Sequence, residues 1–176
     1  AWVANEGYTS NGTTSYLNSN FNLSTGTNYV QNNAAGGIYI RTNISDSTDI
    51  DIGGQSATVG LAINSRHATN GFIAYVNAFT ANAAANTNSQ GLHSVYRTDA
   101  TNQTISKNGT AQNTTAVTSI APPNLNFYIC SLNNNGTAVN FSTRQISMAY
   151  IGAGSINQLS LYNIIQQYMT SLGTQV

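Results

Sequence analysis

Charged side chains are scarce in this sequence. Only 6% of its 176 residues are Asp, Glu, Lys or Arg, with five bases balancing five acids, whereas soluble domains average about 25%. The bases are scattered along the chain, at Arg41, Arg66, Arg97, Lys107 and Arg144. Nucleic-acid binding needs a basic face that neutralises phosphates, so the sequence argues against that class of partner. Solubility must come from Asn, Thr, Ser and Gly.

Cysteine and long apolar runs are also lacking. The one cysteine, Cys130, excludes an internal disulfide, and its apolar surroundings favour a small buried hydrophobe. No apolar run approaches the roughly 20 residues of a membrane-spanning helix. No basic-then-apolar signal segment opens the chain, and its abrupt start at Ala1 is typical of a cleaved product or a piece of a longer chain.

Alternating apolar and polar residues dominate what is present. Ile38 and Ile40 share one face of a predicted strand, and Tyr39 and Arg41 share the other. Further strands are predicted over residues 46–52, 57–63, 71–79 and 92–98. Asn-Gly pairs at 108–109 and 135–136 predict tight hairpin turns, because both positions tolerate positive φ. The length suits a single domain over residues 1–176.

The end of the chain predicts one helix, over residues 156–172. Ser155 is the expected N-cap, with Gln158 at capping-box spacing, and Gly173 the expected stop. Its expected apolar stripe comprises Leu161, Ile164, Ile165, Tyr168, Met169 and Leu172. A single helix most simply covers a sheet edge or the end of a sandwich. An oligomer contact is the alternative.

The ordered set of these elements resembles a known family. The matching segments are Asn11-Gly-Thr, Tyr39-Ile-Arg-Thr-Asn, Tyr96-Arg-Thr, Lys107-Asn-Gly, Leu132-Asn-Asn-Asn-Gly, Ser142-Thr-Arg-Gln-Ile-Ser and Leu172-Gly-Thr-Gln-Val. Together they resemble the laminin-G/concanavalin A-like jelly-roll domains of tailed-phage virion proteins. The resemblance implies an all-β fold, an antiparallel β-sandwich with one C-terminal α-helix. It also implies binding to surface glycans and a place on a virion surface or outside the cell, and no catalytic residue set.

Sugar binding needs planar hydrogen-bonding groups and an aromatic face, which Asn, Gln and Tyr supply without charge. Arginines at strand ends could hold acidic sugars, or could equally lock strands by bonding to turns, which is favoured for Arg144. The alternative for the Asn-rich loops is that they only solubilise the protein and form turns. The candidate glycan-binding residues are Tyr39, Arg41, His93, Tyr96, Arg97, Asn133 and Asn134.

Three acids in one short segment, Asp46, Asp49 and Asp51, offer hard oxygen ligands that suit calcium. No other cofactor is expected, and a polar turn is the alternative reading. Asp49 and Asp51 share a predicted strand face, but a glycosidase needs two carboxylates flanking the bond, and no glucanase-type Glu-x-Asp-x-x-Glu strand is present. We therefore expect no catalytic residues.

The sequence favours a non-enzymatic virion structural or attachment protein, such as a tail-fibre component, with lectin-like binding to surface glycans. The expected partners are copies of itself or other virion proteins, with no nucleic acid and no membrane. A purely structural decoration or filament domain is the first alternative. A polysaccharide-degrading enzyme, in which Asp49 would be essential, is the second.

Overall fold

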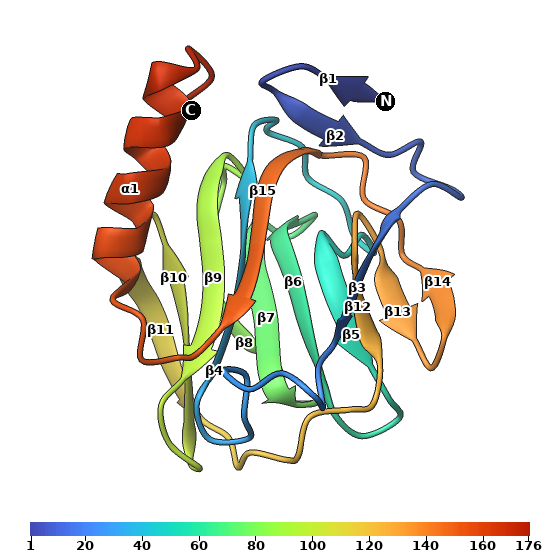
Figure 1. Ribbon diagram of the computed structural model, residues 1–176, viewed down its shortest axis with the longest axis vertical. Helices are drawn as coiled ribbons and strands as arrows, with labels where there is room; N and C mark the ends of the chain where they lie inside the picture. The colour runs from blue at the N-terminus through green and yellow to red at the C-terminus, as the bar shows by residue number, and fades with distance from the viewer.

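The computed structural model describes all residues, 1–176, and consists of two stacked β-sheets with one helix near the C-terminus (Figure 1). The seven-stranded sheet runs in the order β1 (Trp2–Val3), β2 (Gly7–Thr9), β15 (Gln145–Gly152), β4 (Ala34–Ile40), β9 (Gly91–Arg97), β10 (Asn102–Lys107) and β11 (Thr110–Ala116). The eight-stranded sheet runs β14 (Thr137–Val139), β13 (Leu132–Asn134), β5 (Ile52–Gln55), β6 (Gly60–His67), β7 (Gly71–Ala78) and β8 (Asn82–Ala85), with β12 (Asn126–Ile129) joining β5 to β3 (Leu17–Asn22).

Neighbouring strands are antiparallel, except for β13, which pairs with β5 in parallel. The predicted fold class, a concanavalin A-like jelly-roll sandwich with one C-terminal helix, is therefore confirmed. The alternation seen in the sequence fills the space between the sheets, because every second side chain of a strand points to the same face. Ile38 and Ile40 of β4 meet Leu61 and Ile63 of β6 in a core of sixteen buried residues.

Both predicted Asn-Gly turns are confirmed. Asn108 and Gly109 connect β10 to β11 with φ of 50° and 77°, and Asn135 and Gly136 connect β13 to β14 with φ of 50° and 93°. Cys130 is buried as expected, and burial raises the pKa of its thiol to about 12. The helix is neither long nor apolar enough to span a membrane.

The strand predicted over residues 46–52 is mostly irregular. Only isolated bridges form at Asp46 and Ile50, and the regular strand β5 begins at Ile52. The Asp46 carboxylate accepts a hydrogen bond from the Thr48 backbone N–H at 2.9 Å. This local side-chain bond favours a turn over an extended ladder.

Helix α1 spans Gln158–Ser171, and two expectations about its start and position were wrong. Its N-cap is Asn157 instead of Ser155: the Asn157 backbone is extended, and its side chain accepts from the Ser160 N–H at 2.9 Å. The helix lies on the outer face of the seven-stranded sheet, not at an edge. There Ile165 and Met169 pack against Tyr39 of β4 and Leu92 of β9.

The predicted apolar stripe of the helix includes two residues that are exposed in the structure. Ile165 and Met169 are buried, but Ile164 is 65% exposed and Tyr168 is 53% exposed. Each exposed residue precedes a buried one, and so lies about 100° round the helix from it. The sheet packs against only one side of the helix, which leaves Ile164 and Tyr168 facing solvent.

Candidate functional site

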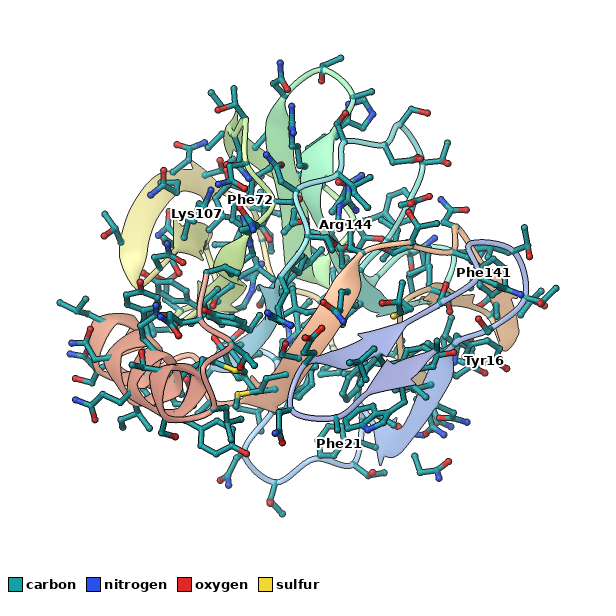
Figure 2. The ribbon with its side chains drawn as sticks, turned by 90° about the horizontal axis from the view of Figure 1, so that it is seen from above. Tyr16, Phe21, Phe72, Lys107, Phe141 and Arg144 are labelled. Carbon is teal, nitrogen blue, oxygen red and sulfur yellow. The ribbon has the colours of Figure 1, made fainter.

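Arg144 lies at the centre of a buried polar network (Figure 2). Its Nη1 is 2.8 Å from Oδ1 of Asp51, and both side chains are fully buried. Its Nε donates to the Ile44 carbonyl at 3.0 Å, and its Nη2 donates to the Arg66 carbonyl at 2.6 Å. The expectation that Arg144 locks strands through turns is confirmed, so this charge is structural.

Three candidate glycan-binding residues also lie in the interior. The Tyr39 hydroxyl donates to the Gln166 amide oxygen at 2.9 Å beneath the helix. The Arg97 Nε donates to the Val76 carbonyl at 2.9 Å, and His93 packs edge-on against Phe72 with ring centroids 5.0 Å apart. Because Tyr39, His93 and Arg97 are at most 1% exposed, they offer a ligand no surface.

The other four candidates are spread over the molecule. Asn133 is buried, and its amide bridges the Asn126 carbonyl and the Gly136 N–H at 2.8 and 2.7 Å. Asn134 is exposed beside the β13–β14 turn, and Tyr96 is half-buried on β9. Arg41 pairs with Glu6 at 3.0 Å. The seven residues therefore do not converge on one site.

The three acids considered for calcium, Asp46, Asp49 and Asp51, do not form a metal-holding group. Asp51 is committed to Arg144, and it also accepts from the Ser142 hydroxyl at 2.7 Å and from the Ser65 N–H at 2.8 Å. Burial, followed by the charge of Asp46, raises the pKa of Asp49 to about 6. The chain gathers no group of three or more His, Cys, Asp or Glu side chains that could hold a metal ion.

A small hollow forms where the two ends of the chain meet. Figure 1 shows the β1–β2 hairpin and the C-terminal end of α1 at the same end of the sandwich. The hollow has a volume of about 150 Å³. Its lining residues are Trp2, Asn5, Glu6, Gly7, Ser147, Tyr168, Met169 and Leu172. We call this site the Trp2–Tyr168 hollow.

Local backbone chemistry brings the hairpin to this place. Gly7 has a φ of 118°, and a Cβ there would lie 2.1 Å from the Ile146 carbonyl oxygen. Only glycine lets β2 approach β15 so closely. The Ser147 hydroxyl donates to the Glu6 carbonyl, and the Glu6 carboxylate pairs with Arg41. Arg41 in turn donates to the Thr174 carbonyl at 2.9 Å, so it ties the hairpin to the C-terminal tail.

The Trp2–Tyr168 hollow combines aromatic and polar groups. Trp2 is 69% exposed and Tyr168 is 53% exposed, and Met169 and Leu172 provide apolar surface beside them. Asn5, Ser147 and the 42% exposed side chain of Glu6 supply hydrogen-bonding groups. Ligand sites are characteristically apolar and aromatic surfaces with a few polar groups that fix orientation.

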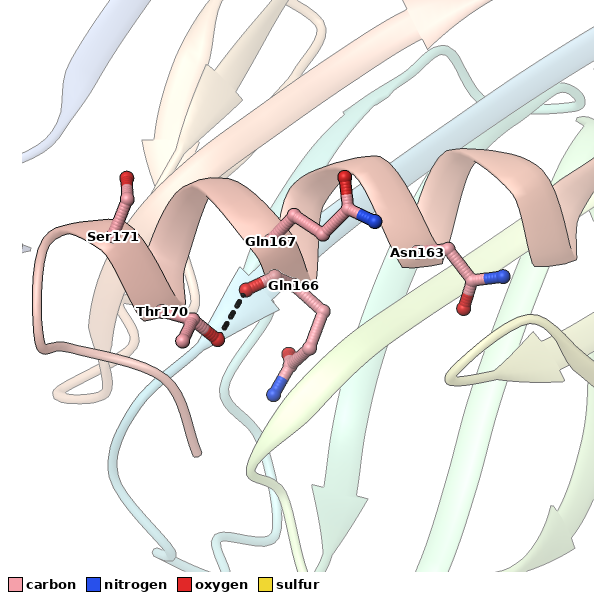
Figure 3. Close-up of a pocket in the computed structure, with 5 residues that line it drawn as sticks. All are labelled: Asn163, Gln166, Gln167, Thr170 and Ser171. Carbon is pink, nitrogen blue, oxygen red and sulfur yellow. Dashed lines mark hydrogen bonds between the residues drawn. The ribbon is translucent and has the colours of Figure 1, made fainter.

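A larger hollow of about 480 Å³ lies along the helix (Figure 3). It is lined only by Asn163, Gln166, Gln167, Thr170 and Ser171 of α1. None of these residues is aromatic or hydrophobic, and the Thr170 hydroxyl donates to the Gln166 carbonyl at 2.7 Å. A solvated helix face accounts for it, so the Trp2–Tyr168 hollow is the better candidate site.

No family model and no curated protein matches the sequence. Solved structures match the fold. The carbohydrate-binding module CBM40 of the Ruminococcus gnavus IT-sialidase superposes with a TM-score of 0.54 at 11% identity, over 86% of this chain and 94% of that one. The same module bound to alpha2,6 sialyllactose matches over 89% and 96%, with the same TM-score and identity. A heptameric SAP-like pentraxin from Limulus polyphemus matches at 0.54 and 11%, over 90% and 79%.

Reasoning from the sequence missed Trp2 and Tyr168. Trp2 belongs to a strand too short to show a pattern, and Tyr168 was assigned to the buried stripe of the helix. One signal was available: Trp2 is the only tryptophan of the chain and lies outside every strongly patterned segment. A large aromatic residue with no predicted core partner is a candidate for a ligand contact.

Proposed function

We propose that this domain is a non-catalytic, lectin-like module that binds glycans in the Trp2–Tyr168 hollow. One observation carries the proposal: two large aromatic side chains from opposite ends of the chain are exposed beside one hollow that also holds amide, hydroxyl and carboxylate groups. Sugars present C–H faces that pack on aromatic rings, and hydroxyls that bond to such polar groups.

The size of the hollow limits the ligand. At about 150 Å³ it is smaller than the roughly 300–1,000 Å³ of sites for drug-sized molecules. It suits a single sugar unit at the end of a chain, not a long glycan. One such shallow contact binds weakly, and many copies acting together raise the avidity by about 10²–10⁴. We therefore propose that the domain acts in an oligomer or a larger assembly.

The comparisons support the glycan-binding part of this proposal. The similar CBM40 module is a carbohydrate-binding part of a sialidase and is seen bound to sialyllactose, and the similar pentraxin is heptameric. A hydrolytic role fits less well, because hydrolysis of a glycosidic bond needs two carboxyl groups and Glu6 is the only acid that lines the hollow. Asp49 and Asp51, considered above for catalysis, are buried elsewhere.

The biological setting rests on the sequence resemblance alone. We propose a tailed-phage virion surface, or another extracellular surface, as the location, and attachment to surface glycans as the role. Copies of this chain or other virion proteins would be its partners. Detection of the chain in purified particles would test this setting.

Glycan-array binding by a multivalent form of the protein tests the proposed site. Wild-type protein should bind a defined set of glycans, and Trp2→Ala and Tyr168→Ala should each lower the apparent affinity about tenfold, the loss expected for an aromatic contact. Phe79→Ala is the matched control, since Phe79 is 53% exposed like Tyr168 but follows β7 of the other sheet. No binding by folded wild-type protein, or equal losses in all three variants, would refute the proposed site.

A purely structural packing domain is the second candidate. It is favoured by the apolar side chains that α1 leaves in solvent, Leu159 and Ile164. Concentration-dependent assembly that Ile164→Glu abolishes, with no glycan signal, would favour it over the glycan-binding module.

A further inference from the structure

Lys107 is the only lysine in the sequence, and it does not point freely into solvent. It is the last residue of β10 and is half-buried. Its Nζ donates to Oδ1 of Asn86 at 2.8 Å and to the Asn88 carbonyl. Figure 2 labels Lys107 and also Phe72, the ring against which His93 packs edge-on. Lys107 has no acidic partner, so its amine faces a side-chain amide.

The Asn86 side chain is held in one orientation. Its Nδ2 donates to the Ser65 carbonyl at 2.6 Å and lies 3.1 Å from Nε2 of His93. Its Oδ1 faces two donors, the Lys107 Nζ and the Asn88 N–H at 3.3 Å. Because oxygen faces donors and nitrogen faces acceptors, the pattern of partners fixes the amide. Adding a C=O length of about 1.23 Å to the 2.8 Å contact places Nζ at most about 4 Å from Cγ of Asn86.

His93 supplies a neutral hydrogen-bond acceptor next to the leaving nitrogen. Its Nδ1 lies 3.3 Å from the Gly91 carbonyl, which places the ring proton on Nδ1 and leaves Nε2 as an acceptor towards Asn86. Burial, helped by the charge of Lys107, lowers the pKa of His93 to about 3, so the ring is neutral. Burial, followed by the charge of Arg66, also lowers the pKa of Lys107 and so favours its nucleophilic, uncharged form.

We infer that Lys107 and Asn86 form an intramolecular isopeptide bond, with release of ammonia. The uncharged Lys107 amine attacks Cγ of Asn86, and a C–N bond forms. The charge that develops on Oδ1 is stabilised by the Asn88 N–H. A proton moves from the attacking nitrogen to Nδ2, and Nε2 of His93, 3.1 Å away, holds Nδ2 in place by accepting its hydrogen bond. The Cγ–Nδ2 bond then breaks and ammonia leaves, so the reaction needs no oxidant, metal or other reactant.

The bond would join the two sheets of the sandwich. Asn86 directly follows β8, the edge strand of the eight-stranded sheet, and Lys107 ends β10 in the seven-stranded sheet. A covalent bond between the sheets limits how far they can separate on unfolding, which suits a domain that must resist mechanical force. This inference is independent of glycan binding in the Trp2–Tyr168 hollow.

Intact-protein mass spectrometry of the purified full chain is the test. The wild-type mass should be lower than the sequence mass by one ammonia, and digestion should yield a branched peptide that joins residues 86 and 107. Lys107→Arg should restore the full sequence mass and lower the melting temperature. His93→Phe, which removes the ring nitrogen that holds Nδ2, should slow the loss.

A succinimide at an Asn-Gly pair also loses ammonia, and Lys107→Arg separates the two reactions, because it leaves the Asn-Gly pairs unchanged. A loss that persists in Lys107→Arg would overturn the inference. So would a wild-type protein of full sequence mass whose Lys107 reacts with an amine-labelling reagent after denaturation. Both measurements on wild-type protein stand even if a variant fails to fold.

Discussion

Around Arg144, all three guanidinium nitrogens and both oxygens of Asp51 are bonded within the protein. In the Trp2–Tyr168 hollow, two aromatic side chains and a 42% exposed carboxylate face solvent instead. Both regions contain side chains that could be assigned a role in binding. Only the Trp2–Tyr168 hollow has large side chains that remain exposed to solvent and available to a ligand.

The contrast shows how a chain with few charges uses them. Arg144 and Asp51 form a fully buried pair, and Arg97 is also buried, bonded to backbone carbonyls. A buried charge without partners costs several kcal/mol, so such groups bond inside the protein. Neutral and aromatic side chains, among them Trp2 and Tyr168, stay exposed and lie with Glu6 where the two ends of the chain meet.

Removing one partner of the buried Arg144–Asp51 pair should have the largest effect on stability. Arg144→Met leaves the Asp51 carboxylate buried without its cation and should lower the free energy of unfolding by about 3–5 kcal/mol. Chemical denaturation measures this. Arg66→Met is the control: Arg66 side-chain bonds go to the Asn43 and Asn70 side chains near the surface, so the loss should stay below about 1 kcal/mol. Equal effects of the two substitutions would show that burial of the Arg144 pair does not matter.

Two adjacent isoleucines of α1 extend the comparison between buried and exposed side chains to the helix beside the hollow. Ile165 is buried against the sheet and Ile164 is 65% exposed. Ile165→Ala should cost about 2–5 kcal/mol through the cavity it leaves. Ile164→Ala should change stability by at most about 0.5 kcal/mol. Thermal unfolding of both variants measures the difference, and a larger loss for Ile164→Ala would mean that the helix docks with another face.

Much of the fold could be predicted because its signals are local. Alternation at Ile38 to Arg41 and the Asn-Gly pairs at 108–109 and 135–136 each depend on a few neighbouring residues. The N-cap is Asn157 and not the predicted Ser155. Both residue types suit that role, and only the path of the chain after β15 decides between them.

The candidate site could not be predicted in the same way, because it depends on contacts across the whole chain. Trp2 and Tyr168 line one hollow only because β1 and β2 pair beside β15 and the helix packs over that sheet. Conversely, Tyr39, His93 and Arg97 had suitable side chains for sugar binding, but the sequence does not show that a helix or the second sheet would cover them. Residue type predicts what a side chain can bind, and only tertiary packing decides whether it is free to do so.

Asp49 offers the smallest and most specific test, since it lies beside the buried network but is not fully bonded within it. Its Oδ2 is buried without a hydrogen-bond partner, and burial and Asp46 raise its pKa to about 6, from a usual value near 3.8. The folded state thus holds this proton more tightly than the unfolded chain does. Its stabilising contribution is complete below about pH 4 and is lost as the pH rises through about 6.

Asp49→Asn should therefore remove a decline in the free energy of unfolding between about pH 4 and pH 6. Denaturation curves at several pH values measure it. Asp99→Asn is the control with the opposite sign, because hydrogen bonds from the Thr101 and Asn102 backbone lower the pKa of Asp99 to about 2. Asp99 therefore stabilises the fold at higher pH and loses that effect as the pH falls through about 2. Parallel wild-type and Asp49→Asn curves would contradict this prediction, because they would show that folding does not raise the pKa of Asp49.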